Sequence, residues 1–400
     1  MTVLALFAAA LACVGILQCL FGLAAVKGFA RSRRHRAEAF DRPPVTVLRP
    51  LCGSEPLLEE ALKSCFQQDY PEYQIVFGIQ DPADPALQLV EKLCRVYPSR
   101  DVRVVIDPTI HGPNRKISNL INMLPAARHD VLVISDSDLH LPENYLDRLV
   151  AELVKPGTGM VTALYVGAPP ASSGCLAARL GATQISHGFL PGVLMSRLMG
   201  RQDCLGSTAM FTRDTLERTG GFQPLVQVLA EDNVFGQRVR ELGLSIALTD
   251  VIPAATVPEP DLPALWQHEL RWTRTIRELA PGSLCASLLQ YPLFWSTLAI
   301  LTSGGTVEAL ALFQASLAVR AVCIRLIDAA LADRVGRPAI PTPIWMLPLR
   351  DLLSVAEIVA SFCVDEVVWR GHRIAATGVC TVPVTDVCTL PVRGTSGDLN

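Results

Sequence analysis

The chain has 400 residues, of which 50% are apolar and 18% are charged, against about 25% charged residues in ordinary soluble domains. This composition excludes a disordered or fibrous protein and favours a protein that is partly embedded in a membrane. The formal net charge of −3 provides no strong positive field, so we expect no nucleic-acid partner. The 12 cysteines include no CxxC pair, which indicates reduced thiols rather than a zinc site.

The first predicted element is an uncharged stretch at residues 2–26. It is long enough to cross a bilayer, which takes about 20 apolar residues. Five basic residues between positions 27 and 36 follow it, whereas a signal peptide carries its positive charge before a shorter apolar region. We therefore predict an uncleaved transmembrane anchor over residues 1–27, with the N-terminus outside and the following domain in the cytoplasm.

Short β-branched runs alternate with helical patterns across a predicted cytoplasmic domain at residues 43–281. We predict strands over residues 45–48, 74–79, 102–106 and 131–134, and helices over residues 57–67, 85–96, 116–124 and 142–153. This alternation implies right-handed crossovers and an α/β fold with a doubly wound, mostly parallel sheet covered on both faces. Ligands of such sheets bind beyond the carboxyl ends of the strands.

Acidic residues follow two of the predicted strands. Asp81 comes just after the second strand, and Asp136 and Asp138 come just after the fourth, so we expect them at one edge of the sheet. Side chains two residues apart in an extended segment point the same way, and a pair of carboxylates suits Mg²⁺ or Mn²⁺ shared with nucleotide phosphates. The alternative is that these aspartates only cap the helix that follows.

Two predicted helix starts carry further charged groups. Lys116 stands where free backbone N–H groups favour anions, which is compatible with a phosphate nearby or with an ordinary helix cap. Glu231 and Asp232 open a predicted helix over residues 233–242. Adjacent carboxylates beside a cleft can raise the pKa of one of them, as a general base requires, although the pair would also complement the helix dipole.

A further helix is predicted over residues 262–279, at the boundary between the soluble domain and the membrane. We expect its basic side to carry His268, Arg271 and Arg274, and its apolar side to carry Leu262, Leu265, Trp266, Leu270, Thr273 and Ile276. Arginine is well shaped to clamp a diphosphate, and tryptophans gather at membrane interfaces. Contact between the arginines and lipid head groups is an alternative that is compatible with the first.

The C-terminal part is apolar again, and we predict membrane segments over residues 283–370. Residues 283–302 and 305–322 predict a helical hairpin with its turn at residues 303–305. Residues 344–368 form a third candidate, but this segment contains Asp351 and Glu357, which are costly at membrane depth unless they are paired. It could span the membrane, re-enter it or lie on its surface. We predict a loose tail over residues 371–400.

Taken in order, these motifs resemble those of membrane-bound GT-A glycosyltransferases and, more narrowly, those of the ceramide glucosyltransferases. The stretches that carry the resemblance are VLRPLCGSEP, QDPADPAL, GPNRKISNL, AED, HELRW and WRGHR. The phrase SNLINMLPAARHDVLVISDSD looks most like the bacterial hopanoid-associated glycosyltransferases. The resemblance extends from residue 43 to residue 373, implies a GT-A-type fold, and is less specific to the acceptor.

The resemblance also implies roles for the acidic residues. Asp81 would contact the uridine, and Asp136 and Asp138 would hold the nucleotide and a divalent metal. Asp232 would be the general base.

For the basic and aromatic residues, the resemblance implies contacts with the substrates. Arg271 and Trp272 would bind the diphosphate side, as in the (Q/R)xxRW signature of these enzymes, in which this chain has His268 at the first position. Taken alone, His187 is more often a hydrogen-bonded core or surface residue than a functional one, but it matches a position that ceramide enzymes place near the acceptor.

We therefore expect an inverting, UDP-sugar-dependent enzyme of glycolipid biosynthesis, a multi-pass protein of the cell inner membrane. It would move glucose or N-acetylglucosamine to a hydroxyl of ceramide or a hopanoid, with Asp232 as base and with the metal and Arg271 neutralising the departing diphosphate. A processive polysaccharide synthase is one alternative, although it favours Gln at position 268 and more spanning helices. A non-catalytic lipid- or partner-binding membrane protein on the same scaffold is another.

Overall fold

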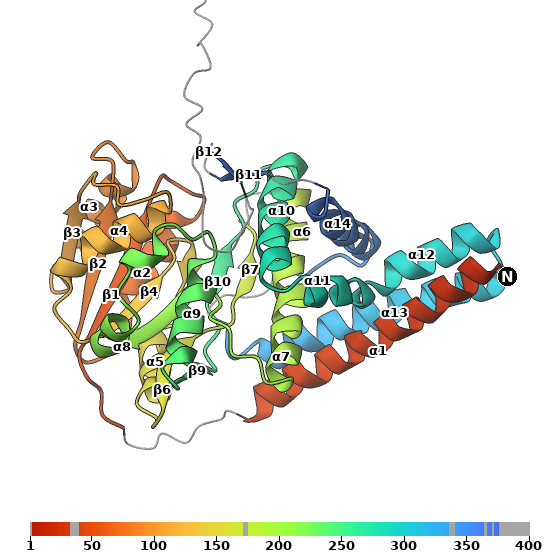
Figure 1. Cartoon of the computed structure of the whole chain (residues 1–400), viewed down its shortest axis with the longest axis horizontal. Helices are drawn as coiled ribbons and strands as arrows, with labels where there is room; N and C mark the ends of the chain where they lie inside the picture. Colours follow the sequence, from red (N-terminus) through yellow and green to blue (C-terminus); the bar gives the residue numbers. More distant parts are fainter. Residues whose placement is uncertain are drawn as a thin grey trace, which may run out of the picture.

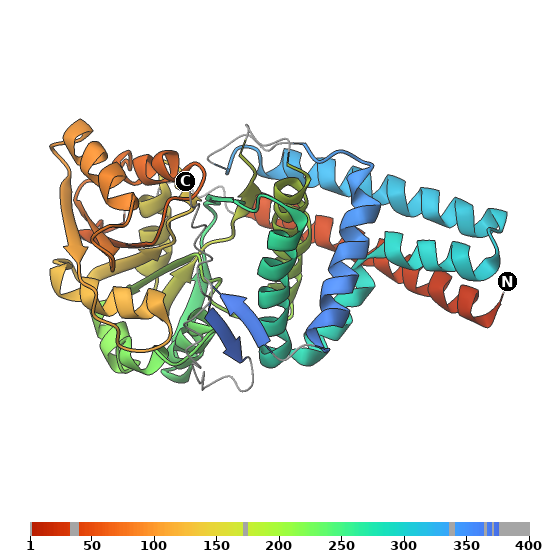
Figure 2. The same ribbon diagram turned by 90° about the horizontal axis from the view of Figure 1, so that it is seen from above.

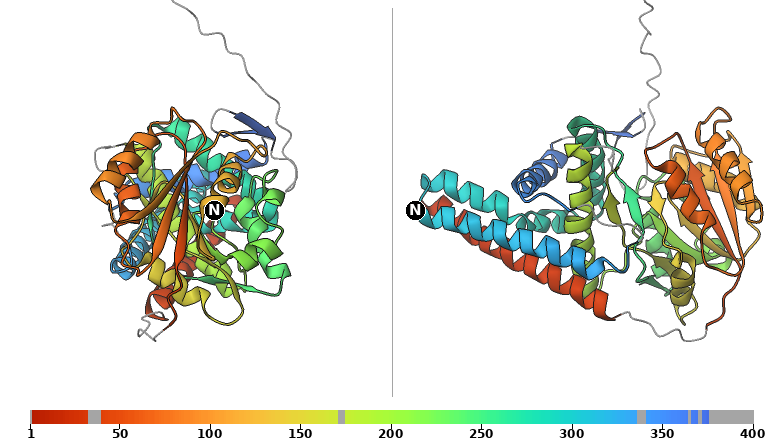
Figure 3. Two further views of the ribbon diagram at one scale, coloured as in Figure 1. Left: turned by 90° about the vertical axis from the view of Figure 1, so that its left-hand side faces the viewer. Right: turned by 180° about the vertical axis from the view of Figure 1, so that it is seen from behind.

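A computed structural model of the chain describes residues 2–32, 40–170, 175–335, 341–363, 366–369 and 372–375. An α/β domain lies at one end of the molecule, and a prong made of α1, α12 and α13 extends from it to the N-terminus (Figure 1). These three helices lie side by side along the prong when the molecule is seen from behind as well (Figure 3).

The central sheet contains seven strands among the described residues, in the order β3-β2-β1-β4-β8-β6-β9. They are β1 (Val45–Leu51), β2 (Tyr73–Ile79), β3 (Asp101–Ile106), β4 (Val131–Ser135), β6 (Thr158–Thr162), β8 (Thr208–Thr212) and β9 (Ser245–Leu248). Strand β8 runs antiparallel to β4 and β6, and the other neighbouring pairs are parallel. The predicted mostly parallel sheet and its first four strands are confirmed.

Helices cover both faces of this sheet because successive strand residues point to opposite sides. Val131 and Val133 share one apolar core with α2 (Leu58–Phe66), α3 (Ala86–Val96) and α5 (Tyr145–Leu153). Leu132 and Ile134 share the other core with α4 (Arg115–Met123), α8 (Arg213–Arg218) and α9 (Glu231–Glu241). Two short 3₁₀ turns, η1 (Leu124–Ala126) and η3 (Gln223–Leu225), lie beside the second core. A small second sheet joins β5 (Leu139–His140), β10 (Ala254–Thr256) and β7 (Val166–Ala168).

The prong contains the helices that are long and apolar enough to cross a membrane. Among the described residues these are α1 (Val3–Ser32) and α13 (Val307–Leu331), with a third span if α11 (Pro281–Ser287) and α12 (Pro292–Ser303) are counted together. The hairpin turn between α12 and α13 is confirmed, since Gly304 and Gly305 adopt φ angles of 74° and 81°, which favour glycine. Helix α1 continues beyond the predicted anchor, as far as Ser32.

One predicted membrane segment is wrong in shape. Residues 283–302 do not form one straight helix, because the chain bends by 67° between α11 and α12, after the short turn η4 (Leu288–Gln290). Pro292 begins α12, and a proline cannot donate the backbone hydrogen bond that would continue the preceding helix.

Two helices connect the prong to the α/β domain. They are α6 (Leu176–Gln184) and α7 (Leu190–Leu198), joined by the π-helical turn η2 (Ile185–Phe189). Val26 of α1 packs in one apolar cluster with Leu190 and Leu194 of the α7 segment and with Ile327 of α13. The membrane helices and the α/β domain therefore share a packed boundary.

Helices α10 (Leu262–Leu279) and α14 (Met346–Ser361) cross the direction of the prong at a steep angle (Figure 2). Helix α14 has 16 residues and is not among the described helices that are long enough to span. Its Asp351 and Glu357 are buried in ion pairs, whereas Leu352 and Val359 are each 54% exposed. The two buried acidic groups are therefore paired, as ionisable groups in apolar surroundings require.

The end of the chain differs from the predicted loose tail. Strands β11 (Glu366–Trp369) and β12 (His372–Ala375) pair in an antiparallel hairpin, so ordered structure continues past residue 371. Residues 376–400 lie outside the described residues, as do three of the five basic residues after the anchor.

Candidate active site

The DSD motif lies at the predicted edge of the sheet but in a different conformation from the one expected. Strand β4 ends at Ser135, and the Leu139 N–H donates to the Asp136 carbonyl at 3.3 Å, so the motif forms a turn and not an extended segment. The Asp136 N–H donates to the Ser207 carbonyl at 3.1 Å, which draws the chain towards the start of β8. The alternation expected for a strand is therefore wrong here.

A buried arginine supports this turn from below. Arg49 of β1 is fully buried, and its Nη2 donates to the carbonyl oxygens of Ser137 at 3.1 Å and Leu139 at 2.6 Å. Hydrogen bonds from a charged donor are stronger than neutral ones, so Arg49 holds the backbone of the DSD turn in place.

Lys116 lies at the centre of the candidate site. Its Nζ is 2.6 Å from Asp136 Oδ1 and 3.5 Å from Glu231 Oε1, and it donates to the Gly206 carbonyl at 3.3 Å. Burial disfavours the Lys116 ammonium, but the carboxylates of Asp136 and Glu231 outweigh that cost and raise its pKa. The ammonium therefore stays charged and ties α4, α9 and the DSD turn together.

The starts of α4 and α9 are also joined directly. The Asn114 side chain caps α4 by accepting from the Ile117 N–H at 3.0 Å, and its Nδ2 donates to Glu231 Oε2 at 3.1 Å. Since Glu231 is the first residue of α9, this contact places the next residue, Asp232, at the same edge of the sheet.

Asp232 is packed against a glycine that leaves room for its carboxylate. A Cβ atom added to Gly206 would lie 2.8 Å from Asp232 Oδ2. Burial and the neighbouring Glu231 carboxylate raise the pKa of Asp232 to about 7, against the opposing effect of Lys116. This carboxyl group can therefore exchange a proton near neutral pH, which a general base must do.

Asp138 has the same elevated proton affinity for a different set of reasons. Burial and the negative charges of Asp136 and Glu55 raise its pKa to about 7. A divalent cation would relieve this repulsion, so the residues present fit a metal that also binds phosphate oxygens. In the described part of the chain, no group of three or more His, Cys, Asp or Glu side chains is placed to hold a metal ion.

Aromatic residues link the carboxylates to α10. Burial and the negative charges of Asp138 and Asp232 raise the pKa of Tyr165. Tyr165 and Trp272 pack on the same apolar cluster, which includes Val257. Trp272 of the HELRW motif therefore shares an apolar cluster with a tyrosine whose pKa responds to the site's carboxylates.

His268 has a specific partner in this structure. Its Nδ1 pairs with the Glu259 carboxylate, from the loop between β10 and α10, and its ring lies 4.3 Å from the Trp272 ring. Arg271 is half-buried on the same helix. The predicted division of α10 into a basic and an apolar side is wrong in part, because Arg274 is fully buried while Leu262 and Ile276 are 43% and 42% exposed. The reason is that α10 packs against both α6 and α14, so residues on its predicted basic side are buried as well.

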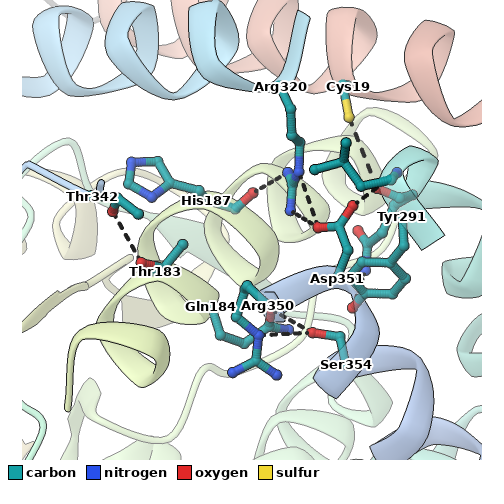
Figure 4. Close-up of polar contacts among 12 residues, drawn as sticks. Cys19, Thr183, Gln184, His187, Tyr291, Arg320, Thr342, Arg350, Asp351 and Ser354 are labelled. Carbon is teal, nitrogen blue, oxygen red and sulfur yellow. Dashed lines mark hydrogen bonds and ion pairs between the residues drawn. The ribbon is translucent and has the colours of Figure 1, made fainter. Parts of the chain in front are cut away.

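Two further predicted site residues lie away from both the cluster around Lys116 and helix α10. Asp81 is exposed at the same edge of the sheet, across β1 from β4, and accepts from the Ala83 N–H at 2.9 Å. His187 faces α13, where its Nε2 is 2.7 Å from Asp328 Oδ1. Its carbonyl accepts from Arg320 of the same helix (Figure 4).

Sequence reasoning missed several residues of this site. Gly206 could have been found from the Gly206-Ser207 pair before β8, which is typical of a close approach between chain segments. Tyr165, Glu55 and Glu259 carry no pattern that separates them from ordinary residues.

The geometry agrees with the comparisons to known proteins. The sequence profile of glycosyl transferase family 21 matches residues 5–378. This chain belongs to glycosyl transferase family 21. The family membership confirms the resemblance at this level and does not show a link to the hopanoid-associated enzymes.

Several proteins of similar sequence are named ceramide glucosyltransferases. The ceramide glucosyltransferase of Komagataella phaffii is 36% identical over 113 residues, which cover 27% of this chain and 22% of that protein. Ceramide glucosyltransferase 3 of Caenorhabditis elegans is 22% identical over 250 residues, which cover 62% of this chain and 54% of that protein. The matched regions therefore cover about half the length of the second relative and less than a quarter of the first.

A solved structure shares the fold across most of the chain. The mannosyltransferase PcManGT from Pyrobaculum calidifontis superposes with a TM-score of 0.51 at 20% identity, covering 90% of this chain and 99% of that one. This likeness confirms a GT-A-like α/β fold with an apolar N-terminal helix and C-terminal apolar helices.

Proposed function

We propose that this member of family 21 moves a glucose-type sugar, glucose or N-acetylglucosamine, from a UDP-sugar to a hydroxyl of ceramide or a hopanoid, with inversion. The observation that carries the proposal is the burial of Asp138 and Asp232 beside Lys116, at the edge of a GT-A-like sheet next to apolar helices. The ceramide glucosyltransferase relatives support the donor and the class of acceptor.

The donor would lie between the carboxylates and α10. Asp81 would contact the uridine, and Lys116 would lie on the phosphate side, where its charge is held by Asp136. Arg271, Trp272 and His268 would complete the diphosphate side from α10. Arginine suits this role because its planar fork matches the geometry of phosphate oxygens.

The metal of this reaction would be Mg²⁺ or Mn²⁺, held by Asp136 and Asp138. The mannosyltransferase of similar fold was solved with GDP-Man and Mn²⁺, which supports a divalent cation in a reaction of this kind. When bound, such an ion supplies positive charge that stabilises the diphosphate as a leaving group.

Asp232 would act as the base. Its carboxylate would take the proton from the acceptor hydroxyl while the hydroxyl oxygen attacks the anomeric carbon from the face opposite UDP. The elevated pKa favours this assignment, because a base whose pKa lies near the working pH combines availability with proton affinity. Arg271 would stabilise the negative charge that develops on the departing UDP.

The lipid acceptor would approach from the membrane side. Helices α10 and α14 would lie at the interface with their exposed apolar residues in the lipid, and the prong would cross the bilayer (Figure 2). The α/β domain would be cytoplasmic, on the inner membrane of the cell. His187 would lie near the acceptor, at the boundary between α13 and the α/β domain.

The decisive experiment replaces the proposed base. We expect Asp232→Asn to lower transfer to lipid by about 10²–10⁴-fold while UDP-sugar affinity stays within a few-fold, because the amide keeps the shape but cannot accept the proton. Transfer is measured by mass spectrometry of lipid products, and affinity by calorimetry with full-length protein. Equal transfer by the variant would refute the assigned base.

Release of UDP from membranes separates the remaining functions. A lipid glycosyltransferase releases UDP when both sugar donor and lipid are supplied, and EDTA suppresses the release. A polymeric product would indicate a polysaccharide synthase. No release with any common UDP-sugar or lipid extract would indicate a binding protein on the same scaffold.

A further inference from the structure

A buried arginine on α14 forms an ion pair with the helix that carries the HELRW motif. Arg350 is fully buried, and its Nη1 lies 2.8 Å and 3.1 Å from the two carboxylate oxygens of Glu269 on α10. Its Nη2 donates to Glu357 Oε2, on its own helix, at 3.0 Å. Two carboxylates therefore share one guanidinium, but only Glu269 belongs to α10.

The same arginine is fixed to α6. Its Nε donates to Ser354 Oγ at 3.0 Å, and that hydroxyl donates to Gln184 Oε1 at 3.2 Å (Figure 4). Its Nη1 also reaches the Leu180 carbonyl, at 3.5 Å. The guanidinium is thus held from three directions, and a planar fork held in this way fixes the position of any carboxylate that it binds.

Residues 268 and 269 are held by different parts of the molecule. His268 pairs with Glu259 of the α/β domain, whereas Glu269 pairs with Arg350 of α14. Successive residues of a helix are about 100° apart around its axis, which places Arg271 about 200° from Glu269. A helix fixed at two adjacent positions on different flanks cannot rotate, so the direction of Arg271 and Trp272 is fixed as well.

We propose that Arg350 is a positioning residue for the donor side of the site, because its ion pair with Glu269 sets the rotation of α10 and thereby aims Arg271 and Trp272 at the diphosphate. This inference rests on the proposed function. It assigns a donor-binding role to a helix that lies beside the membrane and that contains none of the sequence motifs.

The two carboxylates on Arg350 provide a matched pair of variants. Glu269→Gln and Glu357→Gln each replace one buried carboxyl group next to the same guanidinium by an amide of the same shape. We expect E269Q to raise the KM for UDP-sugar and the Kd for UDP about tenfold, with the KM for lipid unchanged, because misplaced binding groups weaken donor contacts. E357Q should stay within about twofold of the wild type for both constants, since Glu269 remains clamped.

A purely structural pair would behave differently. Both variants would then lower the amount of folded protein alike and leave the KM for UDP-sugar unchanged in the active fraction. That result would overturn the inference.

A triple variant covers the case in which single substitutions unfold the protein. E269L/R350L/E357Q removes the buried charges together, and such replacements are often neutral for stability. We expect this variant to fold, judged by its unfolding temperature in detergent, and to bind UDP with Mn²⁺ about tenfold more weakly than the wild type. Wild-type affinity in the folded triple variant would overturn the inference.

The binding assay also separates this inference from the proposed function. Wild-type protein that binds no UDP would refute the proposed function. Wild-type protein that binds UDP, with E269Q and E357Q binding it equally well, would refute only the role of Arg350.

Discussion

The carboxyl groups of the candidate site differ in the charges that surround them. Asp136 has the Lys116 ammonium 2.6 Å away, whereas Asp138 and Asp232 are buried beside further negative charges. Both therefore have a pKa near 7 in the protein without ligands. A bound cation would ionise Asp138, so Asp232 would remain as the group that titrates in the working range.

The pH dependence of the reaction follows from this assignment. We expect kcat/KM with excess Mn²⁺ to rise with pH up to about 7 and then to level off, because only the ionised Asp232 carboxylate can accept the acceptor proton. Initial rates between pH 5 and pH 9 measure this profile when the donor concentration is about tenfold below its KM. A plateau that continues unchanged down to pH 5 would contradict the assignment.

A methyl group at Gly206 should displace the base. We expect Gly206→Ala to lower kcat by about tenfold or more, because the added Cβ would lie 2.8 Å from Asp232 Oδ2. Gly200→Ala is the matched control, since Gly200 also has a positive φ, 89°, but a Cβ there would meet nothing within 4 Å. Equal kinetic constants for the two purified variants would contradict this geometry.

The sequence predicted which residues lie at this site better than it predicted how they lie there. Strand ends place Asp136 and Asp138 at one edge, and that placement needs only the order of the elements. The turn at Asp136 depends on a hydrogen bond to Ser207, and the position of Asp232 depends on Asn114 and on the space at Gly206. Contacts between distant segments of this kind leave no periodic pattern in a sequence.

At the scale of elements, α14 holds its neighbours through buried charges. Arg350 points to α10, and the next residue, Asp351, binds Arg320 of α13 at 2.9 Å. Asp351 also accepts from the Leu293 N–H at the start of α12 (Figure 4). One short helix therefore connects the HELRW helix to the helical hairpin.

Breaking the second of these pairs should destabilise the whole protein. We expect Arg320→Met to lower the free energy of unfolding by about 3–5 kcal/mol, because it leaves the fully buried Asp351 carboxylate without its cationic partner. The measurement is denaturant unfolding in detergent, in which the fraction of folded protein is recorded at each denaturant concentration. R320M/D351L should recover much of the loss, and a double variant as unstable as the single one would contradict the explanation.

The elements themselves were largely predictable, whereas their bends and partners were not. Apolar length predicted α1 and the α12–α13 hairpin, and the glycines predicted its turn. Pro292 marks the bend before α12, but the continuous apolar run around it led to the prediction of a single segment. The pairing of α14 with α10 joins residues 81 positions apart, and one helical pattern cannot reveal the face of another.

At the scale of the whole molecule, both ends of the prong are defined by contacts. Thr2 Oγ1 donates to the Thr302 carbonyl at 3.1 Å at the far end, and Arg334 donates to the Ala30 carbonyl at 2.6 Å near the α/β domain. The N-terminus and the α12–α13 turn therefore share one side, opposite the α/β domain.

This arrangement, together with the proposed cytoplasmic α/β domain, predicts which parts of the protein face each side of the membrane. We expect cysteines introduced at Thr2 and at Val307, which is 77% exposed, to react with an impermeant thiol reagent added outside intact spheroplasts. A cysteine at the exposed Asp69 of the α/β domain should react only after lysis. Each cysteine is introduced singly into a variant from which the native cysteines have been removed. Labelling of Asp69→Cys from outside would contradict the orientation.

The contact between Thr2 and Thr302 has a consequence for how the protein is made. Its two partners are separated by 300 positions, and the entire α/β domain is synthesised between them. At a translation speed of about 5–20 residues per second, α1 must wait roughly 15–60 s in the bilayer before its helical partners emerge from the ribosome. The first helix must therefore be hydrophobic enough to remain inserted alone, which agrees with its mean hydropathy of 2.5, against 1.8 for α13.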